Sequence, residues 1–219
     1  MEIKIVKKVL EAHEKLAEEI ARLLARNGVY AINIIGSPGS GKTLLLERTF
    51  EAAAADLKPG VIEGDIATTA DAERLQRFGV PVVQINTGPF GGDCHLAPNL
   101  IRAALEELPL DDLKTVFVEN VGNLVCPAEF NIGENEKVVV LSLAEGEDKP
   151  LKYPLAFREA NAVVVNKTDL LPHLDVDLDV LRRNVAAVNA GLAVFEASAK
   201  TCDGVGSWVE YVRGRLVGR

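Results

Sequence analysis

The feature that most constrains this chain is a glycine-rich loop at residues 36–43, with the sequence GSPGSGKT. Its spacing, G-x-x-x-x-G-K-T, is that of a loop whose successive backbone N–H groups converge on a phosphate. The apolar run at 29–35 predicts a buried strand before the loop, and 43–55 predicts a helix after it. The predicted nucleotide-binding residues of this loop are Gly36, Ser37, Pro38, Gly39, Ser40, Gly41, Lys42 and Thr43.

Short predicted strands and helices alternate along the rest of the chain. The strands are predicted at 61–65, 80–86, 115–120, 137–143, 162–165 and 193–197, and the helices at 3–26, 70–78, 98–108, 151–158, 176–189 and 205–216. This alternation predicts one α/β domain over residues 1–219, with the fold of a P-loop NTPase. We expect a mostly parallel sheet with helices on both faces, and ligand loops at the carboxyl ends of its strands.

Two carboxylates are predicted at that edge of the sheet, because Asp65 and Glu119 each end a predicted strand. Mg²⁺ prefers a few protein oxygens together with water and phosphate oxygens, so Thr43 with Asp65 or Glu119 is an expected set of ligands. Lys42 can reach the β- and γ-phosphates, and we expect Lys42, Asp65 and Glu119 to support hydrolysis. Which carboxylate orients the attacking water stays open, and Asp71 is a third candidate.

A second motif indicates which nucleotide is bound. Asn166-Lys167-Thr168-Asp169 follows the strand at 162–165, and a carboxylate at Asp169 can accept hydrogen bonds from both N1–H and the exocyclic amine of guanine. Adenine has no amine there, and its N1 lone pair repels the carboxylate. Ser198, Ala199 and Lys200 after the last strand resemble the second base-binding loop of GTPases. The pattern therefore predicts GTP, bound at Asn166, Lys167 and Asp169 and at this second loop.

Composition narrows the class of protein further. The formal net charge is −8, which argues against a broad nucleic-acid interface. No apolar segment approaches the roughly 20 residues that span a bilayer, and the N-terminus lacks a signal-peptide pattern, so we expect a cytoplasmic protein that binds no membrane. Three cysteines cannot form a disulfide framework.

A thiolate and imidazole set stands apart from the nucleotide motifs. Cys94 and His95 are adjacent, and Cys126 follows the strand that ends at Glu119. Such ligands suit Zn²⁺ or Ni²⁺, although buried cysteines without a metal are also common. Three ligands leave the site open unless a second chain supplies more. Cys202 and His13 have no neighbouring ligands; Cys202 is expected to be structural, and His13 to face the surface or a partner.

These motifs together resemble the HypB family, the GTPases that assist nickel insertion into [NiFe]-hydrogenases. The residues that carry the resemblance are Gly36–Thr43, EGDIAT at 63–68, Cys94-His95-Leu96, ENVGNLVCP at 119–127, EGEDKPLKYP at 145–154 and Asn166–Asp169. It covers nearly all of the chain after the first helix. It implies a SIMIBI-class GTPase that dimerises with nucleotide, and a nickel or zinc site at Cys94, His95 and Cys126.

The resemblance also implies partners: another metallochaperone of hydrogenase maturation and the hydrogenase large subunit. Two alternatives stay open. One is a GTPase chaperone for another metalloenzyme, such as urease, although the urease homologue is expected to carry Cys-Pro-His where this chain has Cys-His. The other is a nucleotide-gated metal carrier with negligible turnover, because slow GTPases and pure switches share these loops. An ATP-dependent kinase would leave the Asn166–Asp169 motif unexplained.

Overall fold

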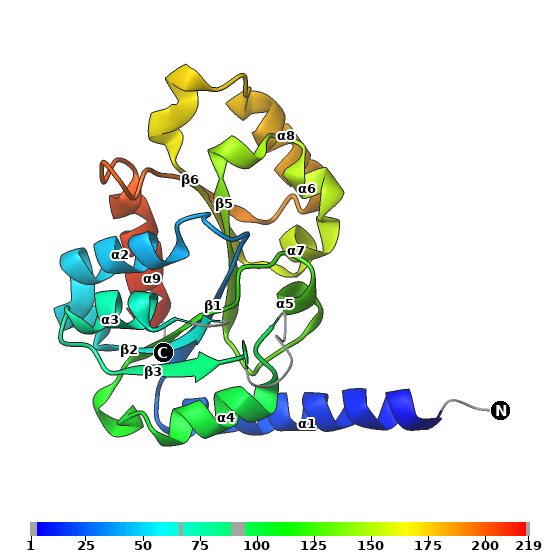
Figure 1. Cartoon of the computed structure of the whole chain (residues 1–219), viewed down its shortest axis with the longest axis vertical. Helices are drawn as coiled ribbons and strands as arrows, with labels where there is room; N and C mark the ends of the chain where they lie inside the picture. The colour runs from blue at the N-terminus through cyan, green and yellow to red at the C-terminus, as the bar shows by residue number, and fades with distance from the viewer. Residues whose placement is uncertain (1–3, 66–67, 89–94, 218–219) are drawn as a thin grey trace.

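The computed structural model describes residues 4–65, 68–88 and 95–217, with side chains from residue 11 onward. One sheet of seven strands forms its centre (Figure 1). The strands are β1 (Tyr30–Ile35), β2 (Pro59–Asp65), β3 (Val82–Asn86), β4 (Thr115–Glu119), β5 (Glu136–Ser142), β6 (Ala162–Asn166) and β7 (Ala193–Glu196). Their order is β3-β2-β4-β1-β5-β6-β7, and every neighbouring pair is parallel. The predicted α/β fold is confirmed.

Helices cover both faces of this sheet (Figure 1). The α-helices are α1 (Lys4–Arg26), α2 (Lys42–Leu57), α3 (Ala70–Gln76), α4 (Pro98–Glu106), α5 (Cys126–Glu129), α6 (Lys149–Lys152), α7 (Pro154–Glu159), α8 (Leu178–Val188) and α9 (Val205–Val217). Short 3₁₀ helices are η2 (Leu110–Asp112), η3 (Leu143–Glu145) and η4 (Thr168–His173). Parallel strands need such crossover helices, because their ends are too far apart for a tight turn.

Three apolar clusters hold the layers together. On one face, α2, α3 and α9 pack on the sheet around Phe50, Phe117 and Trp208. On the other face, α1 and α4 cover β1, β2 and β4, while α5, α7 and α8 cover β5 and β6. The central strands are apolar on both sides, as strands of a covered parallel sheet must be. Buried polar residues within these strands, such as Asn33 and Glu63, are therefore exceptions.

Several boundaries differ from the sequence prediction. The single helix predicted at 151–158 is wrong: it is two helices, α6 and α7, that meet at Tyr153. Pro154 has no N–H to donate and restricts the residue before it to non-helical conformations, which separates the two. Helix α5 and the 3₁₀ helices were not predicted. Their three to six residues are too short for a helical period to appear.

His13 also departs from its prediction. Its ring is half-buried, and it contacts the Phe130 ring at 6.0 Å between centroids, edge to face.

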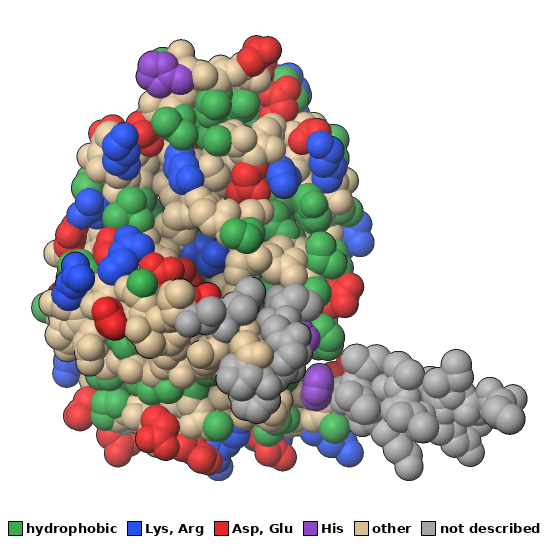
Figure 2. Space-filling view, in the orientation of Figure 1, with side chains coloured by type: hydrophobic (Ala, Val, Ile, Leu, Met, Phe, Trp, Pro, Cys, Tyr) green, Lys and Arg blue, Asp and Glu red, His purple; other side chains and the backbone are tan. Residues whose placement is uncertain are grey.

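No helix in the described part of the chain is long and apolar enough to cross a membrane. On the face seen in Figure 2, acidic and basic side chains are interspersed, without a broad basic surface.

Candidate functional site

The phosphate loop joins β1 to α2 at the carboxyl edge of the sheet. Two of its glycines have no room for a side chain. A Cβ on Gly36 would lie 2.4 Å from the Val140 carbonyl oxygen, and one on Gly41 would lie 2.3 Å from Asn166 Nδ2. Gly41 also has φ +96°, which favours glycine. Positions 36 and 41 therefore require glycine for the loop to pack against β5 and Asn166.

The charged end of Lys42 lies over this loop. Its Nζ is 3.4 Å from the Gly36 carbonyl oxygen and 3.5 Å from that of Ser37, and the residue is 7% exposed. The Ser37 hydroxyl in turn donates to Glu145 Oε2 at 2.5 Å. Glu145 is also 3.5 Å from Lys149 Nζ, so the segment that starts at η3 is tied to the phosphate loop. The sequence prediction gave Glu145 no such role.

A buried pair of carboxylates lies next to Lys42. The Thr43 hydroxyl donates to Glu119 Oε1 at 2.7 Å, and Glu119 is 4% exposed. Glu63 stands opposite Glu119 in the β2–β4 register and is 2% exposed. Among the described residues, neither Glu63 Oε2 nor Glu119 Oε2 has a hydrogen-bond partner. Two buried carboxylates with a free oxygen each are a donor set that fits a hard divalent cation such as Mg²⁺.

Burial changes the acidity of both groups. It raises the pKa of Glu63 to about 8, with a further contribution from the negative charges of Glu119 and Asp65. Burial likewise raises the pKa of Glu119 to about 7, although the Lys42 charge and the Thr43 hydrogen bond oppose it. Loss of hydration on burial is therefore the main reason that both carboxyl groups hold their protons more tightly than they would in water.

Asp65 and Asp71 lie at the rim of the same cleft. Asp65 Oδ2 accepts from the Thr68 N–H and from its hydroxyl, at 3.1 and 2.7 Å. Asp71 pairs with Arg74 at 2.8 Å in the first turn of α3. With Lys42, Thr43, Glu63 and Glu119 they line a cleft of about 530 Å³, open to solvent between the phosphate loop and the end of β2.

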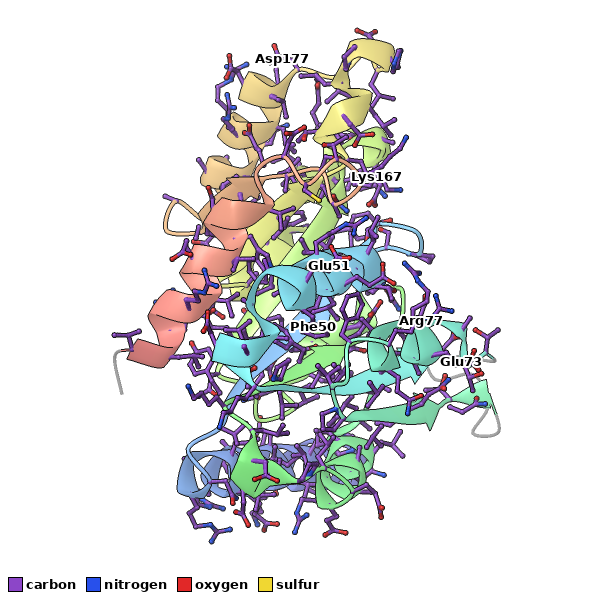
Figure 3. All side chains as sticks on the ribbon, turned by 90° about the vertical axis from the view of Figure 1, so that its left-hand side faces the viewer. Phe50, Glu51, Glu73, Arg77, Lys167 and Asp177 are labelled. Atoms are coloured by element: carbon purple, nitrogen blue, oxygen red, sulfur yellow. The ribbon has the colours of Figure 1, made fainter. Side chains whose placement is uncertain are left out.

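The predicted base-binding loop is attached directly to the phosphate loop. Asn166 Nδ2 donates to the Ser40 carbonyl at 2.9 Å, and its Oδ1 accepts from the Ala199 N–H at 3.0 Å. Lys167 has φ +65° and places its Nζ 2.6 Å from the Gly39 carbonyl oxygen, beside the start of α2 (Figure 3). The side-chain amide of Asn166 thus joins its own loop to the phosphate loop and to the second base loop.

The recognition carboxylate is held from the second base loop. The Ser198 hydroxyl donates to Asp169 Oδ1 at 2.6 Å and accepts from the Thr201 N–H at 3.2 Å. Lys200 is exposed in the turn that follows. The structure therefore brings together the predicted residues of the phosphate loop and of both base loops, and adds Glu63 and Glu145. A glutamate in the middle of an otherwise apolar strand was the signal that could have revealed Glu63.

Of the three candidate metal ligands, the structure describes His95 and Cys126. Cys94 lies outside the described residues. The His95 ring stacks on Phe130 at 4.3 Å with an interplanar angle of 7°, and Cys126 is the first residue of α5, four residues before Phe130. Figure 2 shows histidine side chains where α1 meets the body of the domain. Within the described part of the chain, no three His, Cys, Asp or Glu side chains are close enough to hold a metal ion.

Comparisons with known proteins agree with this geometry. Residues 30–196 match the family model "CobW/HypB/UreG, nucleotide-binding domain". The hydrogenase maturation factor HypB of Rhizobium leguminosarum bv. viciae is 44% identical over 216 residues, covering 97% of this chain and 71% of that protein. The probable hydrogenase maturation factor HypB of Methanocaldococcus jannaschii is 38% identical, covering 95% of this chain and 93% of that protein.

Solved structures give the same result. The crystal structure of HypB from Helicobacter pylori in complex with nickel has a TM-score of 0.89 at 33% identity, covering 94% of this chain and 96% of that one. HypB from Archaeoglobus fulgidus has a TM-score of 0.87 at 38% identity, covering 94% and 100%. FtsY from Thermotoga maritima, at 17% identity and a TM-score of 0.52, shares the fold alone.

Proposed function

Because this chain belongs to the HypB family, within the CobW/HypB/UreG nucleotide-binding domains, we propose that it is a GTP-hydrolysing metallochaperone that assists nickel insertion into [NiFe]-hydrogenase. The observation that carries the proposal is the junction between two sites. The phosphate loop and the guanine motif meet at Asn166, and a loop of six residues leads from Glu119, at the end of β4 beside the phosphate loop, to Cys126.

The nucleotide is held by the backbone of the phosphate loop and by the N-terminus of α2, whose free N–H groups attract phosphate oxygens. Lys42 leaves the Gly36 and Ser37 carbonyls to neutralise the β- and γ-phosphates. Asp169 pairs with N1–H and the amine of guanine, held in place by Ser198. The stem of Lys167 lies over the base plane.

Hydrolysis requires a divalent cation and an oriented water molecule. Thr43, Asp65 and Glu119 would hold Mg²⁺, which would neutralise the negative charge that develops on the phosphate oxygens. Water attacks the γ-phosphorus, the bond to the β–γ bridging oxygen breaks, and GDP and phosphate leave. Asp65, Glu119 and Glu63 line the cleft, and we propose that one of them orients that water.

Nickel is the cargo in this proposal. Cys94, His95 and Cys126 are the proposed ligands, and thiolate with imidazole would also accept Zn²⁺. GTP closes a two-fold dimer, and hydrolysis changes the metal site so that nickel passes to a partner: a second metallochaperone or the hydrogenase large subunit. We also propose that the protein acts in the cytoplasm.

A nickel titration tests the metal part of the proposal. The protein is loaded with Mg²⁺ and GDP or a non-hydrolysable GTP analogue, and nickel affinity is measured by competition with a chromophoric chelator. We expect the affinity to differ between the two nucleotides and to fall in Cys126→Ser. Cys202→Ser is the matched control, because Cys202 is an exposed free cysteine. Equal affinity with both nucleotides would contradict nickel delivery.

Phosphate release tests the enzymatic part. Steady-state release of phosphate from GTP should be measurable with Mg²⁺ and absent in Lys42→Ala. Release that does not differ between wild type and Lys42→Ala would leave a nucleotide-gated carrier as the better description.

Base specificity tests the guanine motif. Asp169→Asn replaces an acceptor by an amide, which can donate to the C2 carbonyl of xanthine but not pair with the guanine amine. We expect GDP affinity to fall by about 10²- to 10⁴-fold and xanthosine diphosphate to bind more tightly than GDP. Fluorescent analogues of both nucleotides give the two dissociation constants. Unchanged GDP affinity would show that Asp169 does not contact the base.

A further inference from the structure

A chain of buried polar side chains crosses the sheet beneath the phosphate loop. Asn120 Nδ2 donates to Asn33 Oδ1 at 3.2 Å, and Asn33 Nδ2 donates to Glu134 Oε1 at 3.2 Å. The same Glu134 oxygen is 3.7 Å from Lys137 Nζ. Asn33, Asn120 and Lys137 are at most 7% exposed, and the Glu134 side chain is 6% exposed. We call these four residues the Asn120–Lys137 network.

One end of this network touches the nucleotide cleft. Asn120 directly follows Glu119, the carboxylate that accepts the Thr43 hydroxyl at 2.7 Å. Asn120 lines the cleft, and its backbone N–H donates to the Ile34 carbonyl at 2.9 Å, next to the phosphate loop. Any change in the position of Glu119 when Mg²⁺ and nucleotide bind is therefore passed to the adjoining Asn120.

The network reaches the loops of the candidate metal ligands at two places, Asn120 and Lys137. Asn120 Oδ1 accepts the Leu96 N–H at 3.2 Å, and Leu96 follows His95. Lys137 Nζ donates to the carbonyls of Ala128 and Phe130, both at 3.1 Å, at the end of the helix that starts with Cys126. Phe130 then stacks on the His95 ring. The network thus supports the His95 loop and the Cys126 helix from one set of hydrogen bonds.

Burial makes the hydrogen bonds of the network depend on one another. A buried donor or acceptor that loses its partner finds no water to replace it, so a shift of one member forces its neighbour to follow. Glu134 is fully engaged, because its second oxygen accepts the Ile132 N–H at 2.7 Å. Chains of packed polar groups of this kind are a physical means of coupling two sites.

We propose that Asn120, Asn33, Glu134 and Lys137 are positioning residues that couple the Mg²⁺–nucleotide cleft to the His95 loop and the Cys126 helix. The inference rests on the proposed function for the identity of the metal, but the coupling between the two places is separate from it. Asn33 is the central link, and it lies away from the nucleotide and from the candidate ligands. Lys137 serves the Cys126 side only.

Three variants test the coupling. Asn33→Ala cuts the network at its centre, and Lys137→Met keeps the length of the side chain but removes its donor. Thr115→Val is the matched control: it removes a buried hydrogen bond of 3.0 Å, to the Leu57 carbonyl, at the opposite end of β4. Each protein is loaded with Mg²⁺ and GDP or a non-hydrolysable GTP analogue. Amide hydrogen exchange at Leu96 and Ala128 is then compared by NMR, without any nickel.

The wild type and Thr115→Val should show exchange rates at both amides that differ between the two nucleotides. Asn33→Ala and Lys137→Met should each reduce that difference at Ala128 by about threefold or more, and both should keep it at Leu96, which is bonded directly to Asn120. GDP affinity within about twofold of wild type shows that a variant is folded. The proposal is overturned if the wild type shows no nucleotide dependence at these amides, or if Asn33→Ala keeps all of it at Ala128.

Nickel affinity supplies the second readout and separates the two proposals. If the wild type binds nickel more tightly with one nucleotide, the ratio should fall by about threefold or more in Asn33→Ala. Nickel affinity could be the same with both nucleotides while the amide exchange rates still differ between them in a way that depends on Asn33. That result would contradict the proposed nickel function and support the proposed coupling. If nickel affinity keeps its full nucleotide dependence in Asn33→Ala, then the network is not the coupling path.

Discussion

Some residues in the cleft are suited to bind a cation but lower the stability of the folded protein because their charge is buried. Glu63 is the clearest case, because it is buried beside Glu119 and one of its oxygens has no hydrogen-bond partner in the part of the chain that the structure describes. Its raised pKa, about 8, means that the folded protein holds this proton more tightly than the unfolded chain does. Stability from this group is therefore greatest below its ordinary pKa of 4.5 and is lost as the pH rises toward 8.

Glu63→Gln should consequently stabilise the protein free of nucleotide and Mg²⁺. The amide resembles the protonated carboxyl, so the gain should be small at pH 5 and reach about 1–3 kcal/mol above pH 8. Urea unfolding at pH 5 and 8.5 measures the difference. Glu51→Gln, on the exposed face of α2, is the control (Figure 3). A Glu63→Gln variant less stable than wild type at pH 8.5 would show that the charge is compensated.

The sequence predicted site residues where a motif fixes spacing, and missed those that only packing brings close. Lys42, Thr43 and Asn166 belong to local patterns whose chemistry can be reasoned from neighbours in the chain. Glu145 reaches Ser37 across 108 positions, and no short pattern encodes that contact. The pairing of Glu63 with Glu119 likewise requires the order of the strands in the sheet.

Among the elements, α9 adds a part-buried ion pair with the sheet to its apolar packing. Arg215 Nε lies 2.6 Å from Glu136 Oε1, and Glu136 is only 4% exposed. Removing the guanidinium leaves a buried carboxylate without its counter-charge, which costs more than the loss of an exposed pair.

Arg215→Ala should therefore destabilise the protein by about 1–3 kcal/mol. Arg213, two residues earlier, pairs with Asp56 and Glu210 at the surface, so Arg213→Ala is a matched control with a much smaller effect. Chemical unfolding of both variants measures the contrast. Equal losses would mean that Glu136 is solvated once Arg215 is gone, and Glu136→Gln in the Arg215→Ala background should then restore nothing.

Element types followed from the sequence better than their limits. Apolar runs such as 115–120 are unmistakable as strands, and the helical period of α1 ends, as predicted, at Arg26 before Gly28, which has φ +68°. The division of 151–158 depended on where Pro154 falls in the turn, and α5 has only four residues. The order of the strands in the sheet could not be predicted, because the residues of a buried parallel strand do not specify which other strand it pairs with.

At the scale of the whole molecule, the proposed switch is a change in assembly. With Mg²⁺ and a non-hydrolysable GTP analogue, the mass in solution should double relative to the GDP form, as light scattering measures directly. Lys42→Ala, which removes the countercharge to the γ-phosphate, should remain monomeric with either nucleotide. A mass that does not change with nucleotide would contradict the dimer and leave the metal site to one chain.

The position of β1 has a consequence for how the protein is made. It lies between β4 and β5, so the strand that carries the phosphate loop is synthesised early but has no neighbour to pair with until residue 119 is available. The junction with Asn166 and Ala199 comes later still. A ribosome-bound chain therefore cannot form the complete nucleotide site until residue 199 has emerged, and β1 stays without a partner strand until β4 has been made.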